Sequence, residues 1–120
     1  MTSETPRPPG PASLSPSIQN HLAEVIRRIV EVAQPDRVIL FGSAARGETG
    51  PDSDLDLLVV KAGVPHRGHL AQDIYVSLFG VPVPVDVLVV TPDDLERYRE
   101  SIGSIIGPAL REGIEVYVAR

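Results

Sequence analysis

The sequence predicts an α/β domain, because short apolar runs of strand length alternate with segments whose apolar residues recur at helical spacing. The runs that fit strands are residues 38–41, 57–60, 83–90 and 114–118. With 120 residues, of which 42% are hydrophobic, the chain has room for one domain built around one core.

Proline dominates the start of the chain, where the first 16 residues hold five prolines and almost no apolar side chains. Such a segment buries too little apolar surface to become ordered. We therefore expect a disordered tail over residues 1–16 and a folded domain over residues 17–120. A recognition motif in the polyproline II conformation is the alternative interpretation of the tail.

Deleting residues 1–14 should leave the melting temperature unchanged, because a tail of this composition contributes nothing to the core. Thermal melts of the full and shortened chains test this expectation. A clear drop in the melting temperature of the shortened chain would mean that the tail packs on the domain.

A first helix is predicted between Ser15, which can cap it with Pro16 at its first position, and Pro35, which ends it. Its apolar positions are Ile18, Leu22, Val25, Ile26, Ile29, Val30 and Ala33. A loop over residues 61–68 then precedes a second helix over residues 70–79, in which Leu70, Ile74 and Leu78 are in register and which Gly80 follows.

The last third of the chain predicts a strand, two helical segments and a closing strand. The strand within residues 83–90 should join the sheet only after Pro84, because proline cannot donate a ladder hydrogen bond. Residues 91–94 begin a helix with acids in its first turn. A further helical stretch from about residue 101 to Gly113 leads into the closing strand.

Three carboxylates interrupt the apolar strands. Asp54 and Asp56 open the second strand, and residues two apart in a strand point to the same face, roughly 6.5 to 7 Å apart. Asp86 is the only charge in the run 83–90. If these strands are neighbours, at about 4.8 Å, the three carboxylates converge and their repulsion favours a bound cation or proton. Hard oxygen ligands of this kind suit Mg²⁺ or Mn²⁺.

A glycine turn follows the first strand. Gly42 allows a sharp turn and the close approach of a ligand to the main chain, and Ser43 offers a hydroxyl and an N–H at the start of a short helical turn. Arg46 adds a positive charge, and Gly47 ends the turn. These donors suit phosphate oxygens.

Two segments resemble the signature of the minimal nucleotidyltransferases, the small members of the DNA polymerase β-like superfamily: Gly42-Ser43-Ala44-Ala45-Arg46-Gly47 and Ser53-Asp54-Leu55-Asp56-Leu57. The family pattern is Gly-Ser, ten residues, Asp-x-Asp. The resemblance implies a nucleotidyltransferase fold, with a mixed sheet of about four strands and helices packed mainly on one face.

The resemblance also implies roles for individual residues. Asp54 and Asp56 correspond to the acids that bind the catalytic metals, and Asp86 to the acid on a later strand that completes the site. Gly42 and Ser43 correspond to the Gly-Ser pair that contacts the phosphates of the nucleotide. Arg46 is expected to help hold the phosphates because of its positive charge.

The implied activity is transfer of a nucleoside monophosphate, AMP from ATP, to a hydroxyl acceptor with two Mg²⁺ ions. Some minimal nucleotidyltransferases are antitoxins that modify a small helical toxin of the HEPN type, which makes such a protein the expected partner. Because few residues follow Asp86, we expect the acceptor surface to come from another chain.

Three other interpretations remain open. Asp-x-Asp alone is often a solvated turn or a helix cap, and Gly-Ser after an apolar run is often a plain turn. The same surface could serve a binding module without catalysis. A glycosyltransferase also uses Asp-x-Asp, for the metal of a nucleotide sugar, but this chain is short for one.

His66 and His69 read as a solvated pair in a loop, without a third ligand for zinc.

Composition excludes several classes of function. The net charge of −5 disfavours long nucleic acid as a substrate, because polyphosphate binding needs a basic surface. The absence of cysteine excludes disulfides and thiolate metal sites. The sequence shows neither a membrane-length apolar stretch nor the apolar region of a signal peptide, so we expect a cytoplasmic protein.

Overall fold

This computed structural model describes residues 16–46, 54–100 and 106–119, with the side chains of residues 16–18 left out. The expected tail, the Ser15 cap, Gly47 and the first part of the last helical stretch lie outside the described residues. Within the described part, no helix is long and apolar enough to cross a membrane.

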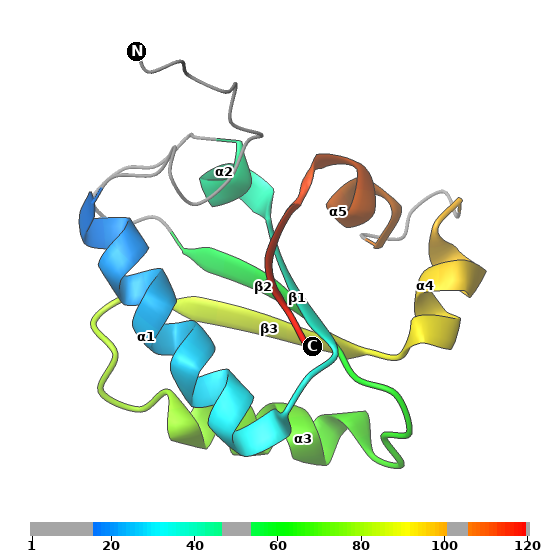
Figure 1. Cartoon of the computed structure of the whole chain (residues 1–120), viewed down its shortest axis with the longest axis horizontal. Helices are drawn as coiled ribbons and strands as arrows, with labels where there is room; N and C mark the ends of the chain where they lie inside the picture. The colour runs from blue at the N-terminus through cyan, green and yellow to red at the C-terminus, as the bar shows by residue number, and fades with distance from the viewer. Residues whose placement is uncertain (1–15, 47–53, 101–105, 120) are drawn as a thin grey trace.

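The elements follow one another as α1 (Pro16–Ala33), β1 (Arg37–Phe41), α2 (Gly42–Ala45), β2 (Leu55–Val60), α3 (Arg67–Ser77), β3 (Val85–Val90), α4 (Pro92–Tyr98), α5 (Ile106–Glu112) and β4 (Ile114–Val118). The strands form one sheet in the order β3-β2-β1-β4 (Figure 1). β1 is antiparallel to β2 and to β4, whereas β2 and β3 are parallel. The predicted mixed sheet of four strands is confirmed, and β3 begins directly after Pro84 as expected.

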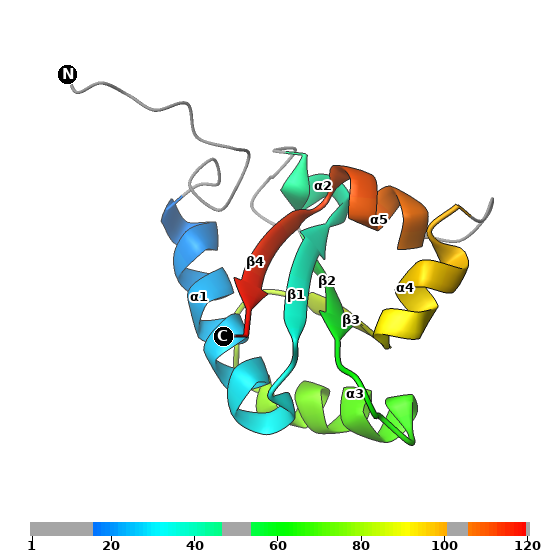
Figure 2. The ribbon, with the colours of Figure 1, turned by 45° about the vertical axis from the view of Figure 1, so that its right-hand side comes forward.

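Helices lie on both sides of the sheet (Figure 2). The two longer helices, α1 and α3, share one face as expected, and their apolar side chains pack on Leu55, Leu57 and Val59 of β2. The short helices α4 and α5 cover part of the other face, where they pack on Leu58 and Val60. Because successive side chains of a strand point to opposite faces, β2 contributes to two separate cores. This explains why the strand is apolar almost throughout.

The start of α3 differs from the sequence prediction. The helix begins at Arg67 rather than at residue 70, so the loop expected over residues 61–68 is too long. Because glycine is a poor helix former, Gly68 argued against a helix in this first turn. An ion pair between the Arg67 guanidinium and Asp94 of α4, 2.9 Å long, ties the turn to the rest of the domain.

The expected histidine pair in a loop is also corrected. His69 lies inside α3 and His66 at its N-cap position, and their rings are 4.9 Å apart between centroids. Among the described residues, no group of three His, Cys, Asp or Glu side chains is arranged to hold a metal ion.

A capping box begins α4, where the sequence predicted a helix with acids in its first turn. The Asp94 backbone N–H donates to the Thr91 hydroxyl at 3.1 Å, and the Thr91 N–H donates to the Asp94 carboxylate at 2.9 Å. Burial alone would raise the pKa of Asp94, but the hydrogen bonds with Thr91 and the charge of Arg67 together hold it below its ordinary value.

Replacing Asp94 with Ala should lower the free energy of unfolding by about 2 kcal/mol, since a cap and a partly buried ion pair are lost together. Asp93→Ala, an exposed change in the same turn, is the matched control and should cost about 0.5 kcal/mol. Urea denaturation measures both losses.

The same carboxylate makes stability depend on pH. Because the pKa of Asp94 is lower in the folded state, its stabilisation is complete above the unfolded pKa of about 3.9 and is lost as the pH falls through the folded pKa. The difference in unfolding free energy between the wild type and Asp94→Asn should therefore shrink below about pH 4. An equal difference at pH 3 and pH 7 would contradict the assignment.

Candidate functional site

Two of the predicted site carboxylates lie side by side on the sheet. Asp56 and Asp86 are each the second residue of their strands, and the parallel register of β2 and β3 places them directly opposite one another. They point to the face that α4 and α5 partly cover, because Leu58 and Leu88, two residues further along each strand, pack there. Asp54 immediately precedes β2 and is exposed.

The electrostatics of Asp56 reflect this crowding. Burial raises the pKa of Asp56, and the nearby charges of Asp86 and Asp54 raise it further. The arrangement therefore favours any positive charge that comes to lie between these side chains.

Three acidic side chains with hard oxygen donors fit a divalent cation such as Mg²⁺ in kind and in charge. Asp56 is close enough to both Asp54 and Asp86 for their charges to raise its pKa. The oxygens of these three side chains are not yet arranged around a common point as a ligand group.

Gly42 packs directly against this carboxylate group. Its backbone has a φ of +77°, and a β-carbon at this position would lie 2.3 Å from Asp56 Oδ2. Phe41, the preceding residue, is the cross-strand neighbour of Asp56 in β1. The glycine is therefore required both for the turn into α2 and for the close approach of the main chain to Asp56.

The remaining predicted residues lie on or just after α2, beside Gly42. Ser43 is half-buried within this helix, and Arg46 follows it as the C-cap residue. The Arg46 guanidinium lies 4.0 Å from a carboxylate oxygen of Glu112, at the end of α5. Sequence reasoning missed Glu112, and no motif could have indicated it, because the contact depends on how the end of α5 packs near the end of α2.

The family comparison covers most of the described domain. The model of the nucleotidyltransferase domain family matches residues 21–114, a range that contains all of β1 to α5 and both predicted motifs. The chain belongs to this family. No curated protein matches the sequence.

Two solved structures share the fold. One is a provisionally named nucleotidyltransferase from Sulfolobus solfataricus, with a TM-score of 0.58 and 19% identity over 82% of this chain and 78% of that chain. The other is a toxin-antitoxin structure with AMP-PNP, with a TM-score of 0.50 and 20% identity over 84% of this chain and 73% of that chain. At such low identity, the likeness concerns the fold.

Proposed function

We propose that this protein is a Mg²⁺-dependent nucleotidyltransferase that transfers AMP from ATP to a hydroxyl group of a partner protein. The observation that carries the proposal is the placement of Asp56 and Asp86 side by side at the start of two parallel strands, with the Gly42 turn against Asp56. Family membership supports the reaction class.

In the proposed site, Asp54, Asp56 and Asp86 hold two divalent ions. When bound, such ions neutralise charge on the attacking and leaving oxygens of an in-line displacement. The acceptor oxygen forms a bond to the α-phosphorus of ATP, the bond to the bridging oxygen breaks, and pyrophosphate leaves. A carboxylate oxygen of Asp86 helps to take the proton of the acceptor hydroxyl.

The phosphates lie against the turn that joins β1 to α2. The Gly42 main chain allows close approach, and the Ser43 hydroxyl and N–H donate to phosphate oxygens. Arg46 contributes its charge from the C-cap of α2, for which it must exchange part of its interaction with Glu112 for the phosphate. Since both partners of that ion pair are about half exposed, the exchange costs little.

Protein modification is favoured over a small-molecule acceptor by two observations. The toxin-antitoxin structure with AMP-PNP combines this fold with a protein complex and a nucleotide analogue. In addition, Val76 and Phe79, in and just after α3, are 70% and 89% exposed, and a partner protein could cover this apolar surface. A helical toxin of the HEPN type is the partner we propose.

Nucleotide titrations test where the phosphates bind. Ser43→Ala and Arg46→Ala should each weaken the binding of Mg·ATP by about tenfold, the scale of one charge-assisted hydrogen bond, and leave adenosine binding unchanged. Arg97→Ala, which removes an exposed arginine of α4, is the control and should change neither affinity. Equal losses for ATP and adenosine would place the nucleotide elsewhere.

A further inference from the structure

The two edges of the sheet differ in what lies beside them. At the β3 edge, the Val87 backbone N–H donates to the Tyr75 hydroxyl at 2.8 Å, so a side chain of α3 occupies part of that edge. At the β4 edge, the strand has β1 on one side, and none of the described strands pairs with its other side. An edge left open in this way can accept another strand.

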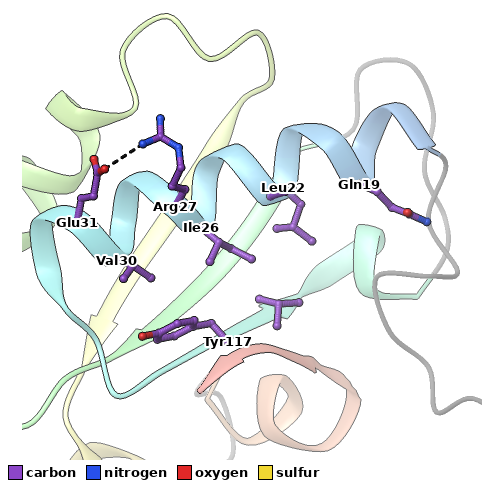
Figure 3. A pocket seen from close by; sticks show the side chains of 9 residues that line it. Gln19, Leu22, Ile26, Arg27, Val30, Glu31 and Tyr117 are labelled. Atoms are coloured by element: carbon purple, nitrogen blue, oxygen red, sulfur yellow. Dashed lines mark hydrogen bonds and ion pairs between the residues drawn. The ribbon is translucent and has the colours of Figure 1, made fainter. Parts of the chain in front are cut away.

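An apolar groove runs beside the open edge, between α1 and β4. It has a volume of about 560 Å³, and β4 contributes Val116 and Tyr117 to its lining. Leu22, Ile26 and Val30 of α1 point toward this strand from one side of the helix (Figure 3). A strand added to β4 would lie along this groove and cover the apolar side chains of α1.

The outer rim of the groove carries charges of both signs. Arg27 and Glu31, one helical turn apart on α1, form an ion pair 2.9 Å long, and both side chains are more than half exposed. Arg27 also pairs with Glu24 of the same helix at 2.7 Å. Arg27 and Glu31 lie on the side of the helix away from Tyr117 (Figure 3). Two copies of α1 that meet in antiparallel orientation would place each Arg27 opposite Glu31 of the other copy, which makes this rim complementary to itself.

We propose that the β4 edge binds a second copy of this chain, with the two β4 strands antiparallel about a two-fold axis. The two sheets then form one continuous sheet, the two α1 helices lie side by side on one face, and the apolar groove of each copy is covered by the other. A second copy would pair with the backbone groups of the edge, cover the apolar groove and place opposite charges next to each other at the rim. Because Asp56 points to the opposite face of the sheet, both candidate sites stay accessible in the dimer.

Cysteine cross-linking tests the strand pairing, since the natural chain contains no cysteine. Facing residues of antiparallel strands have Cα atoms about 4.5 to 5.5 Å apart, within the range of a disulfide. Single cysteines at residues 115, 116, 117 and 118 should give a position-dependent yield of disulfide dimer on oxidation, highest at the position nearest the axis. Val76→Cys, exposed on α3, is the control and should give little dimer. Equal yields at all five positions would overturn the proposal.

Sedimentation equilibrium of the full chain tests the interface by its charges. Arg27→Glu and Glu31→Arg should each raise the dimer dissociation constant at least about tenfold, because like charges then face each other twice across the axis. The double variant Arg27→Glu/Glu31→Arg should return to within about threefold of the wild type. Thermal melts verify that each variant folds. A wild type that stays monomeric at about 0.5 mM would overturn the proposal, as would a dimer that neither single change weakens.

Discussion

Asp56→Asn should reduce AMP transfer by at least about 1,000-fold, since the loss of a metal-binding carboxylate removes several kcal/mol of transition-state stabilisation. The variant should nevertheless fold. Without metal, its melting temperature should equal or slightly exceed that of the wild type, because the change removes a partly buried charge that Asp86 and Asp54 repel.

Thermal melts with and without Mg²⁺, together with transfer assays, measure both effects. Added Mg²⁺ should raise the melting temperature of the wild type and not that of Asp56→Asn. Asp73→Asn removes an exposed carboxylate of α3 and should alter neither transfer nor the response to Mg²⁺. An Asp56→Asn protein that melts lower without metal and keeps full activity would refute the role assigned to this residue.

Gly42→Ala should abolish transfer through a different physical cause. The added β-carbon would lie 2.3 Å from Asp56 Oδ2, so the carboxylate or the turn must move, and the φ of +77° is unfavourable for alanine. We expect a loss of about 2 to 4 kcal/mol in the free energy of unfolding, from backbone strain and the steric clash together. Transfer should fall at least about 100-fold even where the variant is fully folded, because a displacement near 1 Å disrupts a catalytic arrangement.

Gly63→Ala separates the two contributions. Gly63 has a similar φ of +73°, but no atom lies within 4 Å of the position that its β-carbon would take. This control should lose only the backbone term, about 1 to 2 kcal/mol, and should keep its activity. Equal stability losses and equal activities for the two variants would mean that the contact between Gly42 and Asp56 is unimportant.

The strands and the first helix were predictable because their signals are local. Prolines bound α1, and β4 occupies the range that its apolar run indicated. The early start of α3 was not predictable, because the Arg67 ion pair that supports its first turn joins residues far apart in the sequence. The second core, under α4 and α5, depends on the same kind of distant packing.

The pairing of Asp56 with Asp86 followed from strand periodicity once their two strands were assumed to be neighbours. The steric requirement for glycine at position 42, in contrast, could not be predicted from the sequence. Sequence alone offered the turn and the close approach of a ligand, whereas the structure shows that Asp56 itself occupies the space of a β-carbon. The interaction of Arg46 with Glu112 depends on tertiary packing and carried no sequence signal.

The most direct measurement follows radioactive phosphate from ATP to the protein that copurifies with this chain. With Mg²⁺ and ATP labelled at the α-phosphate, the partner should become labelled, whereas ATP labelled at the γ-phosphate should give no label. Labelling should disappear with EDTA and with Asp56→Asn. Label from the γ-phosphate, label that persists with Asp56→Asn, or a partner that binds and is never labelled would contradict nucleotidyl transfer by this carboxylate site.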